Sequence, residues 1–293
     1  LYFNNFKDRL ANFYWTVVKI RMKRKLAVVL LICISCHIGW GAQDFVWKSG
    51  QNMKVVCDTT EAPVVKVALD LLRRDCRSVL SGEISRSENT GNIYVGTWGE
   101  SSVLQALAET HQLDVAQLNE HKEAFLLNVF PDGRLVVAGS DKRGTAYGVL
   151  ELSRMMGVSP WEWWADAVPE KKEEFRLPAG FRKLDYPQVA YRGIFINDED
   201  WGLTPWSWKH YEPSERKGQI GPKTHARIFE LLLRLRANTF WPAMHECSIP
   251  FFFTEGNKEM ADKYAIYLGT SHCEPMMRNT NGEWKMAGKG EYD

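Results

Sequence analysis

Carboxylates and indole rings are concentrated in residues 192–208, RGIFINDEDWGLTPWSW. A short apolar run is followed at once by Asp198, Glu199 and Asp200, and three tryptophans come next. A pair of carboxylates supplies the acid and the base or nucleophile of glycosidic hydrolysis, and an indole face suits stacking against the C–H groups of a sugar ring. The segment therefore indicates carbohydrate chemistry, although tryptophans in loops also cap hydrophobic cores.

Only part of this acidic run can face one site, because neighbouring residues of an extended chain point to opposite faces. We expect Asp198 at the end of a strand, where it would face a substrate pocket, and Glu199 is the weaker candidate. The alternative for Asp198 is an acid that caps the following loop. Asp200 is expected to be a solvated loop acid.

Repeated strand–helix units must position these side chains. Strands are expected at 189–197 and 239–244, helices at 222–238 and 257–269, and a third strand or its exit from Gly269 onward. The first strand is almost continuously apolar, which is typical of a strand buried in a parallel sheet. Such units predict a barrel or a doubly wound sheet, and in both folds functional groups lie at the carboxyl ends of the strands.

Polar pairs follow the second and third of these strands. His245 and Glu246 come after the second strand, and His272 and Glu274 flank Cys273 after the third. In an extended segment His272 and Glu274 would point the same way. These four side chains have no recognised metal-ligand spacing, so we expect no metal site.

Residues 42–185 are expected to form a small α/β domain that precedes these units. Its first helix would place Val65, Leu69, Leu72 and Cys76 on one face. The expected elements are strands at 53–59 and 91–99, helices at 62–80, 102–113 and 141–157 with Gly157 as a C-cap, and a hairpin within 123–140 around a Pro-Asp-Gly turn. A stretch rich in proline and tryptophan follows, and the boundary is placed near 183–188, so that residues 186–293 hold the later units.

The first 41 residues are not expected to belong to the fold. Residues 22–41 begin with basic side chains, continue with an apolar run too short to span a bilayer, and end in small residues, which is typical of a secretory signal. Residues 1–21 would be an in-frame upstream extension. We therefore expect a secreted or periplasmic protein with no membrane contact after cleavage. Lipoprotein cleavage at Cys36 is the weaker alternative.

The composition is that of a soluble globular protein, with 45% hydrophobic and 25% charged residues. A net charge of +1 gives no reason to expect nucleic acid or an anionic membrane as a partner. Thr145 stands where a phosphate-binding loop would carry its lysine, and we expect no cofactor. Export permits a disulfide between Cys57 and Cys76, which the sequence leaves undecided.

Four long blocks, taken in order, resemble glycoside hydrolase family 115, the xylan α-1,2-glucuronidases. They are DKRGTAYGVLELSRMMGVSPWEWWAD, YRGIFINDED, LLLRLRANTFWPAMH and YLGTSHCEPMMRN. The resemblance implies an exported enzyme that removes glucuronic acid, or its 4-O-methyl ether, from xylan with inversion. It also implies a small α/β domain before a (β/α)8 TIM barrel, of which only about three units fit before residue 293. The expected fold class is therefore α/β, with a truncated barrel.

The same resemblance implies a substrate pocket that contains Asp198 and Trp241, although Trp241 could instead be an indole of the barrel core. His272 could bond the glucuronate carboxylate or a ring hydroxyl, and Glu274 would lie beside it. The alternative for His272 is a structural histidine. The family more often has SHHEP where this chain has SHCEP, which weakens position 273 as a ligand.

Three further charged residues are considered as candidates for the same pocket. Glu162 lies among tryptophans and could reach the pocket rim from the small domain. A glucuronate carboxylate calls for a cation, and Arg278 after the third strand is the better candidate. Arg192 starts the first strand, at the wrong end for the site, and is expected to form an ion pair there.

No catalytic acid or base is assigned to any residue present, because the resemblance places both on later barrel strands, beyond Asp293. The sequence is interpreted as part of an exported α-glucuronidase that is inactive alone and whose partner is glucuronoxylan or a related uronic-acid-decorated polysaccharide. Whether it forms a homodimer is left open. The alternatives are another barrel glycosidase, such as a hexosaminidase-like enzyme, and a carbohydrate-binding protein without catalysis.

Overall fold

A six-stranded sheet with the order β3-β2-β4-β6-β5-β8 organises the N-terminal part of the molecule. The computed structural model describes residues 41–111, 113–197, 201–270, 284–285, 288 and 290. β2, β3, β4 and β6 run parallel, while β5 is antiparallel to both of its neighbours. The strands are β2 (Asn52–Cys57), β3 (Glu83–Ser87), β4 (Ile93–Thr97), β5 (Phe125–Val129), β6 (Leu135–Gly139) and β8 (Arg182–Asp185).

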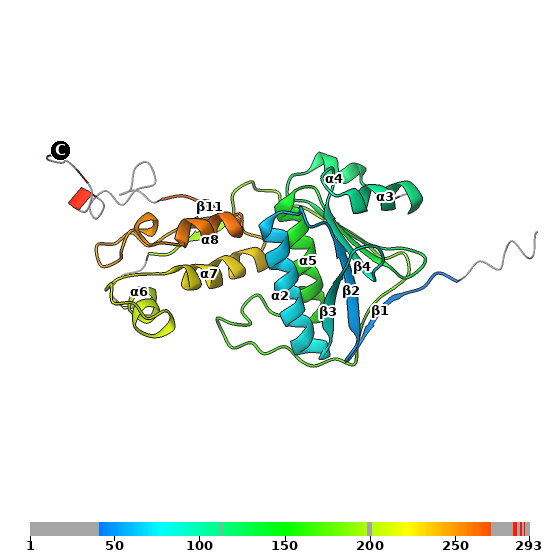
Figure 1. Cartoon of the computed structure of the whole chain (residues 1–293), viewed down its shortest axis with the longest axis horizontal. Coiled ribbons are helices and arrows are strands. Elements are labelled where there is room, and N and C mark those ends of the chain that lie inside the picture. Colours follow the sequence, from blue (N-terminus) through cyan, green and yellow to red (C-terminus); the bar gives the residue numbers. More distant parts are fainter. Residues whose placement is uncertain are drawn as a thin grey trace, which may run out of the picture. The chain divides into compact units, whose positions relative to one another are not determined.

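Helices cover both faces of this sheet (Figure 1). Alternation along β2 places Val55 and Val56 on opposite faces, and the two side chains belong to different buried clusters. The Val55 face carries α2 (Pro63–Leu80) and α5 (Lys142–Met156), which pack against each other. The Val56 cluster takes its other side chains from α3 (Ser102–His111), α4 (Ala116–Glu120) and the strands. The result is a mixed α/β fold with two cores.

The helices and the hairpin expected from periodicity are present. Val65, Leu72 and Cys76 are fully buried on α2, and the hairpin β5–β6 pairs Val129 with Leu135 around the predicted turn. Helix α5 begins at the side chain of Asp141, which accepts bonds from the backbone N–H groups of Arg143 (2.9 Å) and Gly144 (3.0 Å). It ends at Gly157, whose φ of 100° confirms the predicted glycine C-cap.

Several strands were not predicted from the sequence. β1 (Phe45–Lys48) pairs antiparallel with β7 (Glu174–Leu177), and β3 and β8 occupy the two edges of the six-stranded sheet. These strands are short, and β3 and β8 are largely polar. Their hydrogen-bond partners lie far away in the sequence, so local patterns do not reveal them.

A second, three-stranded parallel sheet has the order β11-β10-β9. Its strands are β9 (Gly193–Phe195), β10 (Thr239–Trp241) and β11 (Tyr267–Leu268), with Phe240 opposite Ile194 and Leu268. The prediction of a buried strand at 189–197 is wrong in its length and its burial. β9 is shorter, and Tyr191 and Ile194 are 69% and 42% exposed. Among the described residues β9 is an edge strand that pairs with β10 alone, which leaves this exposure.

Helices α7 (Pro222–Arg234) and α8 (Asn257–Lys263) connect these strands. Pro222 occupies the first turn of α7, as expected. The predicted helix 257–269 is too long, because α8 ends at Lys263 and Ala265 adopts a left-handed conformation with φ 54°. The chain then enters β11 two residues before Gly269. Between β9 and α7 lie the short helix α6 (Leu203–Trp206) and a π-helical turn, η1 (Ser207–Tyr211), and the 3-10 turn η2 (Phe251–Phe253) precedes α8.

Buried carboxylates join the two sheets. Glu123, which precedes β5, accepts hydrogen bonds from Arg143, Arg192 and Asn238. The Arg192–Glu123 ion pair confirms the role expected for Arg192 at the start of the strand. Glu151 on α5 likewise pairs with Arg236 at 2.7 Å. These contacts fix the position of β9 and β10 relative to the six-stranded sheet.

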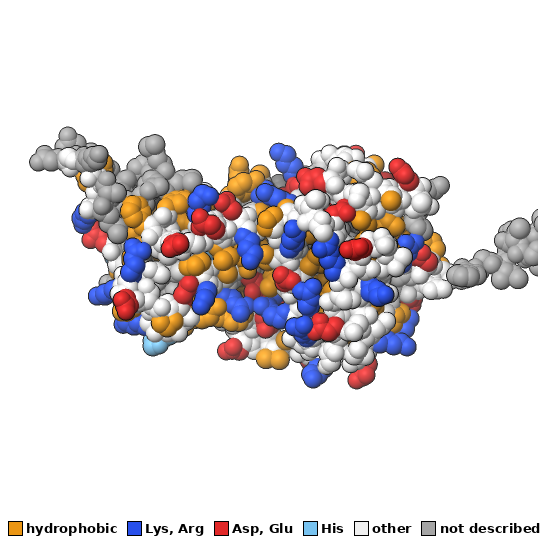
Figure 2. Space-filling model, viewed as in Figure 1, with side chains coloured by type: hydrophobic (Ala, Val, Ile, Leu, Met, Phe, Trp, Pro, Cys, Tyr) orange, Lys and Arg blue, Asp and Glu red, His pale blue; other side chains and the backbone are white. Residues whose placement is uncertain are grey.

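Acidic and basic side chains are interspersed over the face shown in Figure 2. No helix among the described residues is both long and apolar enough to cross a bilayer. The segments expected to be the upstream extension and the signal, up to residue 40, lie outside the described residues, and the domain boundary near 185 stays a prediction.

Candidate active site

Trp241 ends β10 on the face of the small sheet that points away from α7. Alternation puts Thr239 and Trp241 on this face and Phe240 on the other. Phe240 is 1% exposed and packs edge-on against Phe229 of α7, with 5.4 Å between the ring centroids. Trp241 therefore lies on the face of the sheet that α7 does not cover.

A pocket of about 250 Å³ opens beside Trp241. Trp241 is 40% exposed there, and its ring centroid lies 6.1 Å from that of Phe195 on β9. Gly193, which has no side chain, is the register partner of Thr239 on the neighbouring strand. The lining residues are Tyr191, Gly193, Ile194, Phe195, Thr239 and Trp241. The pocket thus offers aromatic faces and the hydroxyls of Tyr191 and Thr239, a combination suited to a sugar ring.

The three strands of this sheet end at one edge. The backbone N–H of Ile196 donates to the carbonyl of Trp241 (3.0 Å), and that of Gly269 donates to the carbonyl of Phe240 (3.0 Å). Because the strands are parallel, the segments that follow them all start from the edge where Trp241 lies. This is the arrangement expected for the polar groups after each strand.

Most of the site residues predicted from the sequence cannot be placed. Asp198 and Glu199 lie outside the described residues, as do His272, Glu274 and Arg278. Trp241 is thus the one residue of the predicted substrate pocket whose surroundings can be described at this edge. The pocket role of the other five stays a prediction.

Glu162 lies on the loop after α5 and bonds to α2. Its carboxylate accepts a hydrogen bond from Arg74 at 3.2 Å, and Arg74 also pairs with the buried Glu230 of α7. The described contacts of Glu162 therefore tie it to a charged cluster between α2 and α7. Its proposed approach to the pocket rim stays a prediction.

His245 and Glu246 form an exposed turn after β10. The carbonyl of His245 accepts a bond from the N–H of Ser248 (2.9 Å), and Glu246 lies 3.5 Å from the ammonium of Lys285. Among the residues that the structure describes, no group of three or more His, Cys, Asp or Glu side chains could hold a metal ion.

The loop tryptophans form an aromatic cluster between the loop after α5 and the α6–η1 region. Trp206 stacks on Tyr211 with 4.8 Å between centroids, and Trp163 lies edge-on to both Tyr211 and Trp164. The guanidinium of Arg227 sits 4.8 Å over the Trp163 ring. These rings are half-buried, and Trp164 also packs against the larger hydrophobic core, whereas Trp201 is 88% exposed.

Tyr191 and Phe195 are pocket residues that the sequence reasoning missed. Both precede the acidic run, and the predicted site was based on the carboxylates that follow them. The signal that could have identified them is the two-residue period of Tyr191, Gly193 and Phe195, which places all three on the face that Thr239 and Trp241 share across the strand pair.

Comparison with known proteins gives a match to a family model and matches to solved structures. The family model "Glycosyl hydrolase family 115" matches residues 184–293. A solved structure described as a family GH115 4-O-methyl-alpha-glucuronidase with specificity for decorated arabinogalactans is 62% identical, with a TM-score of 0.81. The alignment covers 85% of this chain and 32% of that one, so this chain spans about a third of the length of its relative.

Other solved structures are more distant. A Streptomyces plicatus β-hexosaminidase is 15% identical with a TM-score of 0.47, covering 78% of this chain and 43% of that one. A GH138 enzyme targeting pectin rhamnogalacturonan II is 13% identical with a TM-score of 0.44, covering 79% and 33%. Similarities of this size do not decide between glycosidase families, and comparison with curated protein sequences gave no match. The match to the family model over the second sheet and the 62% identity across most of the chain show that this protein belongs to glycosyl hydrolase family 115, a family of glycoside hydrolases.

Proposed function

We propose that the whole protein is an exported α-glucuronidase that removes glucuronic acid, or its 4-O-methyl ether, from the side chains of a polysaccharide. The observation that carries this proposal is the half-exposed Trp241 in an open pocket at the shared edge of three parallel strands. A chain that is 62% identical to a 4-O-methyl-alpha-glucuronidase supports the same chemistry.

We further propose that β9, β10 and β11, with α7 and α8, are the first units of a (β/α)8 barrel. Their parallel order and the helices between them support this architecture. In such a barrel the pocket beside Trp241 would open at the carboxyl ends of the strands, where barrel enzymes carry their active sites. Asp198, His272 and Arg278 would join it from the segments that follow β9 and β11.

Trp241 is proposed to stack on the pyranose ring of the uronic acid. An inverting mechanism needs two carboxyl groups about 6.5–9.5 Å apart with a water between them. We assign no described residue to either role, and therefore propose that residues 1–293 alone do not hydrolyse the substrate.

Two polysaccharide backbones, xylan and arabinogalactan, are candidates for the substrate. The similar enzyme is specific for decorated arabinogalactans, whereas the sequence resemblance suggested xylan. We propose a uronic-acid-decorated polysaccharide as the substrate class. Incubating the whole protein with glucuronoxylan and with decorated arabinogalactan, and measuring the released uronic acid, separates the two backbones.

The test of the site replaces Trp241 with Ala in the whole protein. Loss of one stacking contact should lower kcat/KM about 10-fold, since aromatic contacts of this kind contribute up to about 1.5 kcal/mol. Trp161→Ala is the matched control, because Trp161 is similarly exposed (48%) and does not line the pocket. Equal activity of both variants would remove Trp241 from the site, and no uronic acid release from either polysaccharide would overturn the proposed function.

A further inference from the structure

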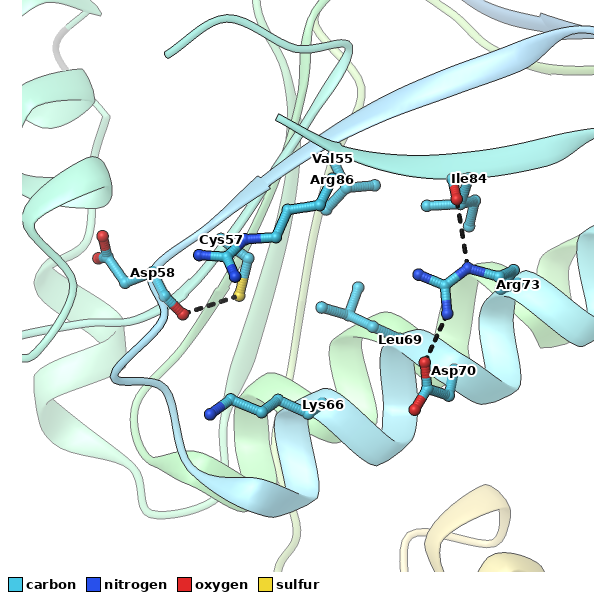
Figure 3. Close-up of a pocket in the computed structure, with 9 residues that line it drawn as sticks. All are labelled: Val55, Cys57, Asp58, Lys66, Leu69, Asp70, Arg73, Ile84 and Arg86. Atoms are coloured by element: carbon cyan, nitrogen blue, oxygen red, sulfur yellow. Dashed lines mark hydrogen bonds and ion pairs between the residues drawn. The ribbon is translucent and has the colours of Figure 1, made fainter. Parts of the chain in front are cut away.

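A second pocket lies in the small α/β part, between α2 and the β2–β3 edge of the six-stranded sheet. It has a volume of about 150 Å³ and shares no residue with the pocket beside Trp241. Figure 3 shows its lining residues, which come from β2, α2 and β3. They are Val55, Cys57, Asp58, Lys66, Leu69, Asp70, Arg73, Ile84 and Arg86.

The floor of this pocket is apolar. Val55 and Ile84 are 3% and 5% exposed, and Leu69 packs against the same core from α2. Cavities of about 150 Å³ can hold a six-membered ring, as the binding of benzene in an engineered cavity of that size shows. A pyranose ring could place its C–H face on this floor.

Two cations extend over the floor without a protein partner. Lys66 comes from α2 and Arg86 from β3, and both reach toward the Cys57 end of the pocket (Figure 3). Both side chains are exposed. In the described part of the chain, the side chain of neither residue forms a hydrogen bond or an ion pair with another residue.

The two acids of the pocket are already engaged. Asp58 accepts hydrogen bonds from the hydroxyls of Ser101 (2.8 Å) and Ser102 (3.1 Å), and its carboxylate points away from the cavity in Figure 3. Asp70 pairs with Arg73, whose Nε also donates to the carbonyl of Ile84 (3.2 Å). The acids therefore leave the charge of Lys66 and Arg86 free for a ligand.

The thiol at this end of the pocket does not supply a competing anion. Burial, with the nearby Glu61 and Asp58 carboxylates, raises the pKa of Cys57 to about 12. Cys57 therefore presents a neutral, weakly polar surface between the two cations at neutral pH.

We propose that this pocket is a second, non-catalytic binding site for a uronic acid residue. Lys66 and Arg86 would bind its carboxylate by charge-assisted hydrogen bonds, and the pyranose ring would lie on Val55, Leu69 and Ile84. A site of this kind would hold a decorated polysaccharide at the small α/β part while another side chain is hydrolysed. The choice of a uronic acid over other carboxylates rests on the proposed function.

The experiment titrates the full chain with sodium glucuronate by calorimetry, in a Trp241→Ala background that weakens binding at the other pocket. The double variant Lys66→Gln/Arg86→Gln should weaken glucuronate binding at least 10-fold. The control double variant Lys54→Gln/Lys171→Gln makes the same change in net charge with two exposed lysines outside the pocket and should bind normally. Leu69→Trp, which fills the cavity without a charge change, should also abolish binding.

Three further ligands, glucose, acetate and sulfate, identify what the pocket recognises. Glucose has the ring without the carboxylate, and acetate has the carboxylate without the ring, so each should bind at least 10-fold more weakly than glucuronate. Acetate and sulfate binding as strongly as glucuronate would mean an adventitious ion only and would overturn the proposal. Identical titrations of the two double variants would overturn it as well. If the whole protein released no uronic acid while this binding persisted, the proposed activity would fail and the binding site would stand.

Discussion

The indole of Trp241 occupies the space beside Gly269, where a Cβ atom would lie 2.2 Å from the indole Nε1. Gly269 directly follows β11, and its backbone N–H is bonded to Phe240. The absence of a side chain at position 269 therefore allows the indole to lie against the neighbouring strand. The orientation of the proposed sugar platform depends on this glycine.

Gly269→Ala should move the indole and weaken substrate binding. A Cβ contact of this length forces the neighbouring group to shift, and the movable group here is the side chain of Trp241. We expect KM of the whole protein to rise several-fold with a small change in stability, measured by initial rates on an oligosaccharide that carries the uronic acid.

The control for this prediction is a double-mutant cycle. In a Trp241→Ala background, Gly269→Ala has no indole to displace and should add little to KM. Independent, additive effects of the two substitutions would show that Gly269 acts through the backbone instead of through the indole.

Local periodicity sufficed to predict α2, α5 and the β5–β6 hairpin. Each of these is formed by contacts within one segment, so the pattern of apolar residues and the Gly157 cap carry the information. β1 and β7 could not be predicted in this way, because each is four residues long and its partner lies more than a hundred positions away.

Only part of the candidate site could be predicted from the sequence, because some of its residues come together through strand pairing. Trp241 was predicted as a pocket residue from the family resemblance of the block that contains it, whereas Tyr191 and Phe195 became pocket residues only through the register of β9 against β10. The members of the charged clusters lie even farther apart in the sequence. Arg74 and Glu230 are 156 positions apart, and no local pattern pairs them.

Glu230→Gln should cost about 3–5 kcal/mol of the free energy of unfolding. Glu230 is 5% exposed and lies among Arg74, Arg227 and Arg234. Burial raises its pKa, but the hydrogen bond from Arg74 and the three positive charges lower it by more, so the net shift of the pKa is downward. Removing one partner of a buried ionic cluster leaves the remaining charges uncompensated, which is the costly case. Urea denaturation followed by circular dichroism measures the loss.

Glu259→Gln is the control for this prediction. Glu259 is exposed on α8, and the same change in charge should alter stability by less than about 0.5 kcal/mol. If Glu230→Gln were no more destabilising than Glu259→Gln, the cluster would not hold α2 and α7 together.

Cys57 and Cys76 should react slowly with alkylating agents in the native protein. Both are buried, free thiols, so the disulfide that export permits is not formed in the structure. Burial raises the pKa of each thiol to about 12, and the thiolate is the reactive form. Iodoacetamide at pH 8, followed by peptide mass spectrometry, should label the half-buried Cys247 first and the other two only after unfolding. A cross-linked peptide pair containing Cys57 and Cys76 would contradict this prediction.

The stability of the protein should fall between pH 6.5 and pH 4 because of His225. Burial lowers the pKa of this histidine from 6.5 to about 4, although hydrogen bonds to the Gly221 carbonyl and Asn257 oppose the shift. Rings of Phe229, Phe240 and Phe251 surround it. Between the two pKa values the unfolded chain binds a proton that the folded chain does not, so the contribution is complete above pH 6.5 and is lost as the pH falls to about 4. The loss is on the order of 3 kcal/mol.

His225→Gln separates this histidine from the other titrating groups. Glutamine cannot titrate, so the variant should lose less stability than the wild type when the pH is lowered from 7 to 5, whatever its stability at pH 7. His210→Gln removes an exposed histidine and should keep the wild-type slope. The comparison uses the change in unfolding free energy with pH, because a packing defect lowers stability equally at both pH values. The same slope in all three proteins would show that His225 is not the group that links stability to pH in this range.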